Sequence, residues 1–192
     1  MTKPVLAALM ACAASLCAVS PALAEAPAAA AQGAPECITE AEVVAAQQAW
    51  GEGIVAIGRV HGEGGDYVAA ARDHIQTHYG YDQGLVLFKP TLAAQEQFRT
   101  SFDAALSYFV GGNPSFPEDS GFAIKPWTRV RWMNAGIIND GCTMAVAMGN
   151  YFFTPAGGGA EVKVEYTLGY VRDDAGRLRI VVHKSSLPYS EG

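Results

Sequence analysis

The chain has 192 residues, half of them hydrophobic, and carries a net charge of −6 from 13 basic and 19 acidic side chains. This net negative charge argues against binding to nucleic acid or to an anionic membrane, since both attract basic patches. Its length fits a single domain that can bury a sizeable core.

Residues 1–24 have the pattern of a cleavable signal peptide. Lys3 precedes a short apolar run that ends in an A-x-A motif at Ala24. The run is too short and too rich in alanine for a membrane span, and a lipoprotein signal ending at Cys12 fits the sequence less well. Cleavage after Ala24 predicts a soluble periplasmic or secreted protein with no membrane attachment, and loss of Lys3 would take its net charge to −7.

Residues 25–36 are nearly all Ala, Pro and Gly, which is typical of a linker, so the predicted domain spans residues 37–189. The mature chain would keep two cysteines, Cys37 and Cys142. In an oxidising compartment we expect them to form a disulfide, although two buried free thiols remain an alternative. A loop of this length predicts a stabilisation of about 4–5 kcal/mol in the chain-entropy model.

The first half of the domain reads as helical. Thr39 and Glu42 form a capping-box pattern that starts a helix reaching about residue 57. A second helix is predicted over residues 66–79, and Gly80 is expected to end it in a left-handed conformation.

A short buried-type strand over residues 85–88 precedes the third helix, predicted over residues 92–109. Arg99 flanks the apolar stripe of this helix and could reach a pocket. The stripe consists of residues at helical spacing, namely Phe98, Phe102, Ala105, Leu106 and Phe109.

Four strands follow, separated by short turns typical of hairpins. They are predicted over residues 128–138, 143–153, 162–171 and 178–186. Trp127 and Trp132 are expected to pack this sheet rather than to bind a ligand. The order of elements predicts an α+β domain in which a curved antiparallel sheet wraps around helices. This is a cone-shaped, ketosteroid-isomerase-like single domain with a pocket between its layers.

The last predicted strand ends in polar residues that alternate between two faces. His183 and Ser185 lie on one face, whereas Lys184 and Ser186 lie on the other. A base and a hydroxyl on one face are a minimal arrangement for handling a proton.

Six separated blocks of the domain carry a resemblance to one family. The blocks are Ala46-Gln47-Gln48-Ala49-Trp50-Gly51, Phe88-Lys89-Pro90-Thr91, Gln97-Phe98-Arg99, Ala105-Leu106-Ser107-Tyr108-Phe109-Val110-Gly111-Gly112, Met148-Gly149-Asn150-Tyr151-Phe152-Phe153 and His183-Lys184-Ser185-Ser186-Leu187-Pro188-Tyr189. Together they resemble the iota class of carbonic anhydrases, whose domain is similar to the association domain of calcium/calmodulin-dependent kinase II. The resemblance implies reversible hydration of carbon dioxide to bicarbonate and a proton.

The resemblance also implies site residues. Metal-free members of the family hold the substrate with hydroxyl groups, which match Thr91, Tyr108 and Ser185. His183 is the candidate catalytic base, while Lys184 replaces a second His that is typical of the family. Each residue also has a structural interpretation: Thr91 as a helix N-cap, Tyr108 and His183 as core residues, and Ser185 as a partner for the backbone at the strand end.

A zinc site of three histidines would need three convergent imidazoles. His74 and His78 share a face of the predicted second helix, but no nearby motif supplies a third ligand. We expect these two histidines to belong to the polar outer face of that helix. No metal is therefore expected to be obligatory, with zinc or manganese as the alternative, since members of the family differ in metal requirement.

Other functions on the same fold remain open. The chain could be a non-catalytic association or small-ligand-binding module. An isomerase or hydrolase would usually need a buried carboxylate, yet Glu165 alternates with apolar residues and is expected to point outward. We expect at least a homodimer, paired through the sheet.

Overall fold

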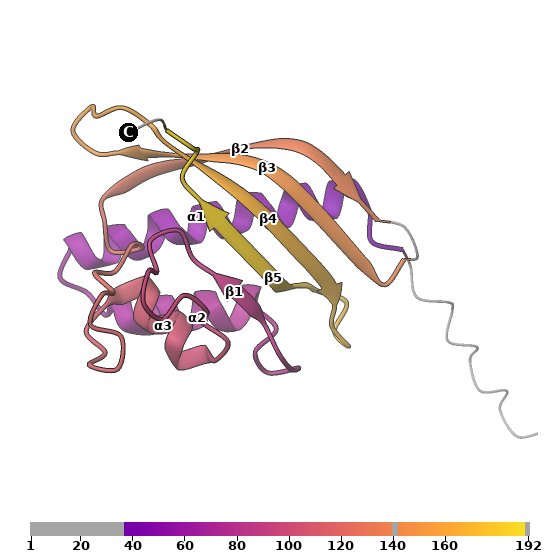
Figure 1. Cartoon of the computed structure of the whole chain (residues 1–192), viewed down its shortest axis with the longest axis horizontal. Coiled ribbons are helices and arrows are strands. Elements are labelled where there is room, and N and C mark those ends of the chain that lie inside the picture. The colour runs from indigo at the N-terminus through magenta and orange to yellow at the C-terminus, as the bar shows by residue number, and fades with distance from the viewer. Residues whose placement is uncertain (1–36, 140–141, 191–192) are drawn as a thin grey trace, which may run out of the picture. The chain divides into compact units, whose positions relative to one another are not determined.

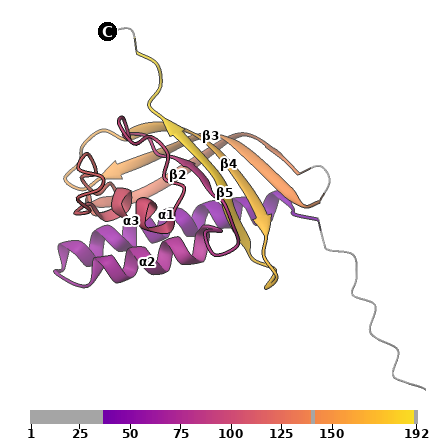
Figure 2. The ribbon, with the colours of Figure 1, turned by 60° about the horizontal axis from the view of Figure 1, so that its bottom comes forward.

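The computed structural model describes residues 37–139 and 142–190. The predicted signal peptide and the whole of the predicted linker, residues 25–36, lie outside this range. Three helices pack on one face of a five-stranded curved sheet, the predicted α+β cone (Figures 1 and 2). The elements in chain order are α1 (Glu40–Gly62), α2 (Tyr67–His78), β1 (Leu87–Lys89), α3 (Phe102–Val110), β2 (Trp127–Ile138), β3 (Met144–Pro155), β4 (Val162–Arg172) and β5 (Leu178–Ser186).

The sheet is antiparallel from β2 to β5, as predicted, but β1 joins β5 in parallel. The strand order is β1-β5-β4-β3-β2, with Phe88 opposite His183. The sequence predicted β1 without its partner, because its pairing joins segments far apart in the chain. The parallel pairing brings the segment after β1 beside the polar end of β5, and this juxtaposition creates the site.

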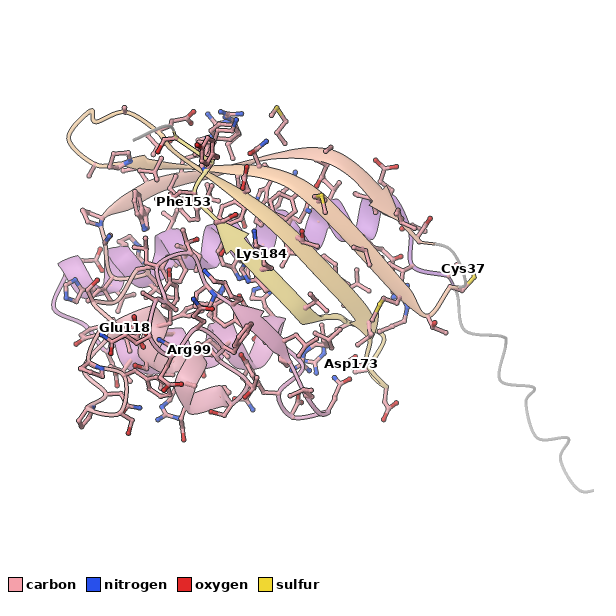
Figure 3. All side chains as sticks on the ribbon, viewed as in Figure 1. Cys37, Arg99, Glu118, Phe153, Asp173 and Lys184 are labelled. Atoms are coloured by element: carbon pink, nitrogen blue, oxygen red, sulfur yellow. A yellow bond between two sulfur atoms is a disulfide. The ribbon has the colours of Figure 1, made fainter. Side chains whose placement is uncertain are left out.

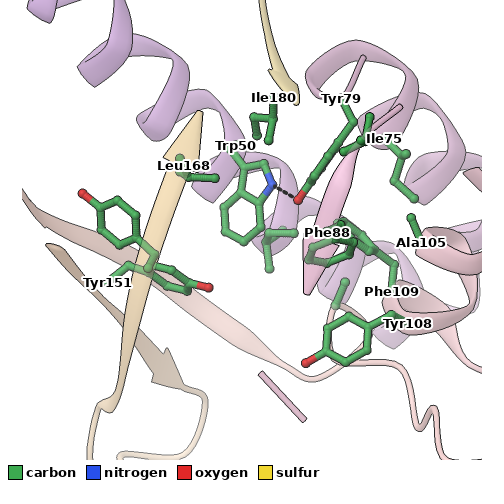
Figure 4. Packing of buried hydrophobic residues seen from close by; sticks show 14 of the residues in the cluster. Trp50, Ile75, Tyr79, Phe88, Ala105, Tyr108, Phe109, Tyr151, Leu168 and Ile180 are labelled. Atoms are coloured by element: carbon green, nitrogen blue, oxygen red, sulfur yellow. Dashed lines mark hydrogen bonds between the residues drawn. The ribbon is translucent and has the colours of Figure 1, made fainter. Parts of the chain in front are cut away.

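The core lies between the inner face of the sheet and the helices. On β4, Val164, Tyr166 and Leu168 are buried while Glu165 is exposed, which confirms the predicted alternation of unlike faces. Trp50 on α1 is 2% exposed and lies among aromatic rings from the sheet, such as Trp132 and Tyr151, and from Phe122 in the segment between α3 and β2 (Figure 4). Burying a large apolar side chain contributes about 1.5–3 kcal/mol, so these inner residues dominate the stability of the fold.

Helix α1 starts at the predicted capping box, since the Thr39 hydroxyl accepts from the Glu42 amide and Glu42 bonds back to Thr39 N. The helix continues to Gly62, beyond the predicted end near residue 57. Its glycines permit close packing: a Cβ on Gly53 would collide with the imidazole ring of His74.

Two further features of the helix ends differ from the prediction. Helix α3 starts at Phe102 with Ser101 as its N-cap, rather than near residue 92. Helix α2 ends as predicted, but Gly80 does not adopt a left-handed conformation. Instead Tyr79 is extended and forms a bridge to Ile180 of β5, so pairing with the sheet replaces the expected glycine cap.

Cys37 and Cys142 form the predicted disulfide, which ties the start of α1 to the turn between β2 and β3. Figure 3 labels Cys37 at this end of the domain. Among the helices of the described range, none is both long and apolar enough to cross a bilayer.

Candidate active site

A cavity of about 220 Å³ opens between the helices and the inner face of the sheet. Exposed residues such as Leu92 and Leu187 stand at its mouth, whereas His183 and Ser185, each 2% exposed, lie at its inner end. All four predicted site residues line it. The lining consists of Trp50, Phe88, Thr91, Leu92, Tyr108, Phe122, Lys125, Trp127, Tyr151, Phe153, Val162, Val164, His183, Ser185 and Leu187.

Thr91 and Ser185 contact each other in this cavity. The Thr91 hydroxyl donates to Ser185 Oγ at 2.9 Å, across the junction that the β1–β5 pairing creates. The N-cap interpretation of Thr91 is wrong, because the residues after it form turns and α3 begins only at Phe102.

Tyr108 reaches the same cavity from α3. Its hydroxyl accepts a hydrogen bond from the Leu92 amide at 3.3 Å, and its ring packs edge-on against Phe88 (Figure 4). Burial raises the pKa of Tyr108 to about 12, so the phenol keeps its proton at neutral pH. Tyr108 is therefore both a core aromatic and a donor available to the cavity.

Tyr151 is a fourth hydroxyl at this site that the sequence analysis did not assign. It lies on β3, is 3% exposed, and its hydroxyl oxygen is 3.4 Å from His183 Nε2. Burial raises the pKa of Tyr151 above its ordinary value. Its inward alternation with Ala147 and Phe153 is the signal in the sequence that could have revealed it.

His183 lies between two phenols. Tyr79 OH is 2.8 Å from its Nδ1, and Tyr151 OH faces its Nε2, while Phe88 stacks on the ring at 5.0 Å between centroids. Burial lowers the pKa of His183 to about 3. The ring is therefore neutral at physiological pH, and it both lines the cavity and packs in the core.

Lys184 and Glu165 point away from this site, as predicted. Both are exposed on the outer face of the sheet, where Ser186 links them: Lys184 Nζ donates to Ser186 Oγ at 2.7 Å, and Ser186 donates to Glu165 at 2.8 Å. The residue that replaces the second His of the resembled family does not line the cavity.

Arg99 does not line the cavity, so the suggestion that its side chain could reach a pocket is wrong. Its fully buried side chain forms ion pairs with Asp119 at 2.8 Å and Glu118 at 3.4 Å (Figure 3). The Arg99 amide donates to Phe88 O at 2.7 Å. These contacts hold the segment after β1, including Thr91, against the rest of the domain.

Glu118 secures the same segment through backbone amides. Its carboxylate accepts from the N–H groups of Ala94, Gln95 and Glu96 at 2.8–3.3 Å. The amide of Gln95 contributes most to lowering the pKa of Glu118 to about 2. The carboxylate is therefore ionised at neutral pH, and it satisfies three amides of a segment that is not helical.

The expectation that the two histidines of α2 lie on a polar outer face is wrong. His74 is 7% exposed, packs on Trp50, and lies 4.5 Å from the half-buried His78 between ring centroids. Burial lowers the pKa of both rings, that of His78 to about 4. Within residues 37–139 and 142–190, no three His, Cys, Asp or Glu side chains converge as metal ligands would.

Two further lining residues had no predicted role at a site. Trp127 is half-buried and lines the cavity while it also packs on Phe153, so its expected packing role is only part of its environment. Lys125 is exposed at the mouth and is the charged side chain among the described lining residues.

The fold and the site together define an α+β cone with a buried, hydroxyl-lined cavity. The family model described as metal-independent carbonic anhydrase matches residues 41–187. A metal-independent carbonic anhydrase from Nostoc sp. is 48% identical over 157 residues, covering 80% of this chain and 76% of the relative. The crystal structure of a cyanobacterial iota-carbonic anhydrase complexed with bicarbonate superposes with a TM-score of 0.78 at 46% identity, covering 81% and 95% of the two chains.

The chain therefore belongs to the metal-independent carbonic anhydrases, which confirms the resemblance read from its sequence. Carbonic anhydrases are lyases, so the protein belongs to that class of enzymes. The family description also supports the expectation that no metal cofactor is obligatory.

Proposed function

We propose that the hydroxyl-lined cavity catalyses the reversible hydration of carbon dioxide to bicarbonate and a proton. The observation that carries this proposal is the convergence of Thr91, Tyr108, Tyr151 and Ser185 on one apolar cavity. The bicarbonate bound by a cyanobacterial relative of 46% identity supports the choice of substrate.

The two parts of the cavity suit two forms of the substrate. Apolar walls such as Phe88 and Phe153 suit carbon dioxide, which is uncharged, and the hydroxyls suit the oxygens that become negative as bicarbonate forms. Pre-positioned donors facing a developing oxyanion are worth about 3–4 kcal/mol each. Fixed orientation of water and carbon dioxide in a small cavity lowers the barrier further.

In this mechanism the oxygen of a water molecule bonds to the carbon, and one C=O bond yields its electron pair to an oxygen that the hydroxyls stabilise. The released proton passes to solvent or buffer at the mouth. Burial lowers the pKa of His183 to about 3, which makes its ring a poor proton acceptor at neutral pH. We therefore assign His183 a hydrogen-bonding role in place of the general base suggested by the sequence.

Stopped-flow measurement of carbon dioxide hydration tests this proposal on protein treated with a strong chelator. We expect activity to survive metal removal. Activity that disappears and returns with zinc or manganese would contradict the metal-free mechanism. Absence of activity in metal-free and metal-supplemented protein alike would favour the non-catalytic binding module instead.

We also propose that the protein is exported after cleavage near Ala24, to the periplasm or the exterior. The disulfide between Cys37 and Cys142 supports an oxidising compartment. Intact mass of the protein purified from its native host tests this: a chain starting at Glu25 with oxidised cysteines is expected, and a chain retaining Lys3 would contradict it.

A homodimer through the outer face of the sheet remains our proposal for assembly. Four exposed apolar residues on that face support it, namely Met133, Ile138, Met144 and Met148. Contiguous exposed apolar surface is typical of interaction sites. Sedimentation at micromolar concentration tests the assembly: a monomer would contradict the proposal.

A further inference from the structure

A line of hydrogen bonds runs from the core to the inner end of the cavity. Trp50 Nε1 donates to Tyr79 OH at 3.1 Å (Figure 4), and Tyr79 OH is 2.8 Å from His183 Nδ1. His183 Nε2 is 3.4 Å from Tyr151 OH, which lines the cavity. All four side chains are at most 3% exposed, so water cannot freely replace these partners.

The donors and acceptors in this line restrict where the protons can be. The indole N–H of Trp50 can only donate, so the Tyr79 oxygen must accept from it. Tyr79 then has one proton and one lone pair left for His183. Two arrangements follow, one for each neutral tautomer of the imidazole.

In the first arrangement Tyr79 donates to a bare Nδ1, and the proton on Nε2 points to the oxygen of Tyr151. Every group in the line is then satisfied, and the hydroxyl proton of Tyr151 is free to point into the cavity. In the second arrangement Nδ1–H donates to Tyr79. The Tyr79 proton then has no acceptor within the described residues, since its hydrogen-bond partners there are Trp50 and His183.

The second arrangement also changes what the cavity receives. A bare Nε2 would accept the Tyr151 proton, so Tyr151 could present only lone pairs to a bound ligand. A buried phenol proton without an acceptor is costly, whereas the first arrangement leaves none. The first arrangement is therefore the one that this core favours.

We propose that Trp50 and Tyr79 hold His183 as the Nε2–H tautomer and thereby make Tyr151 a hydrogen-bond donor to the cavity. Tyr79 and Trp50 are positioning residues, since they act on the tautomer through His183. Tyr79 does not line the cavity, and Trp50 lines it with its ring while its N–H is bonded to Tyr79. The effect on catalysis rests on the proposed carbon dioxide hydration, whereas the assignment of the His183 tautomer is independent of it.

Nitrogen-15 NMR of the histidine ring tests the tautomer directly at pH 7. In the wild-type protein we expect His183 to show a protonated Nε2 and a bare Nδ1. Observation of the Nδ1–H tautomer would overturn the proposal whether or not the protein hydrates carbon dioxide.

Tyr79→Phe removes the donor with little change of shape. We expect both ring nitrogens of His183 to shift toward intermediate values, because neither tautomer then satisfies the whole line. The matched control is Tyr170→Phe, which also deletes a buried phenol oxygen, one without a partner among the described residues. We expect that control to leave the His183 spectrum unchanged, and near-UV circular dichroism identifies any variant that fails to fold.

Kinetics of a double-mutant cycle test the positioning role. We expect Tyr151→Phe to lower kcat about tenfold. Tyr79→Phe should lower kcat by about twofold, in proportion to the Nε2–H tautomer that remains, and both variants should have a smaller effect on KM. In the Tyr151→Phe background, Tyr79→Phe should add little, because its effect passes through the missing hydroxyl. Fully additive losses, or an unchanged rate in Tyr79→Phe, would overturn the positioning role.

Discussion

At the scale of single residues, the site consists of hydroxyl groups that distant parts of the chain supply. Thr91 follows β1, Tyr108 belongs to α3, Tyr151 to β3 and Ser185 to β5. Each oxygen can be deleted with little change of shape, which makes the account testable one group at a time. His183 differs, because its ring is also part of the stacked core.

We predict that Thr91→Val, Tyr108→Phe and Ser185→Ala each lower kcat/KM for carbon dioxide hydration at least tenfold. A tenfold loss corresponds to about 1.4 kcal/mol of transition-state stabilisation, a modest share of what an oxyanion donor provides. Stopped-flow assays at saturating buffer would measure it. Three variants with wild-type rates would show that the site assignment is wrong.

Lys184→His offers the matched control for that series. Lys184 lies on the outer face of the sheet, bonded to Ser186, so restoring the histidine that the resembled family carries should leave the rate unchanged. A tenfold gain in rate would instead mean that the outer face takes part in catalysis.

Buried neutral histidines predict a loss of stability in acid. Burial lowers the pKa of His74, His78 and His183 in the folded state, so the unfolded chain binds more protons as the pH falls below about 6.5. Above that pH the histidines are neutral in both the folded and the unfolded state, so the free energy of unfolding is at its full value. Below it, the free energy of unfolding falls by about 1.4 kcal/mol per pH unit for each histidine that stays neutral in the folded state.

Urea unfolding between pH 7.5 and 5 would measure this slope, in a range above most carboxylate titrations. A free energy of unfolding that does not decline toward pH 5 would contradict it. His183→Gln, if folded, should show a shallower slope than the wild-type protein.

At the scale of elements, the segment between β1 and α3 decides where Thr91 lies. The sequence has helical spacing there, yet the Glu118 carboxylate accepts from the amides of Ala94, Gln95 and Glu96, and this segment is irregular rather than helical. The competing partner lies more than 20 residues further along the chain. A local pattern could not reveal it.

We predict that Glu118→Ala loosens this segment. Hydrogen exchange of the amides at residues 94–96 should become faster, and the rate of hydration should fall because Thr91 loses its fixed position. The control is Glu96→Ala, whose exposed side chain lies in the same segment. Unchanged exchange in Glu118→Ala would show that the carboxylate does not hold the segment.

Local signals predicted most of the elements. The Thr39 capping box, the alternation in β4 and the start of the second helix at Asp66 all depend on signals within a few residues, and each is present in the structure. The parallel pairing of β1 with β5, the burial of His74 against Gly53 of α1 and the role of Arg99 depend on contacts between distant segments. Local sequence patterns could not predict those three features.

The same division holds for the site. Thr91, Tyr108, Ser185 and His183 were predicted through the family resemblance, and the structure brings them to one cavity. Tyr151 lies within one of the matching blocks but was not predicted as a site residue, because an inward tyrosine on a strand resembles any core aromatic. Only the fold reveals that its hydroxyl faces His183.

At the scale of the whole molecule, the disulfide closes most of the domain into one loop, with its cysteines 105 residues apart in sequence. We predict that the Cys37→Ser, Cys142→Ser double variant loses up to about 4–5 kcal/mol of unfolding free energy, as the chain-entropy model gives. Urea denaturation of both proteins would measure it. Equal midpoints would contradict a stabilising role for the bond.

The central claim is that the hydroxyl-lined cavity binds the product of the reaction. A crystal structure of this protein with bicarbonate, prepared after chelator treatment, tests it most directly. The account predicts bicarbonate within hydrogen-bonding distance of Thr91, Tyr108 and Ser185, with Tyr151 OH directed toward one of its oxygens. Bicarbonate bound elsewhere on the molecule, with this cavity holding only water, would contradict the account.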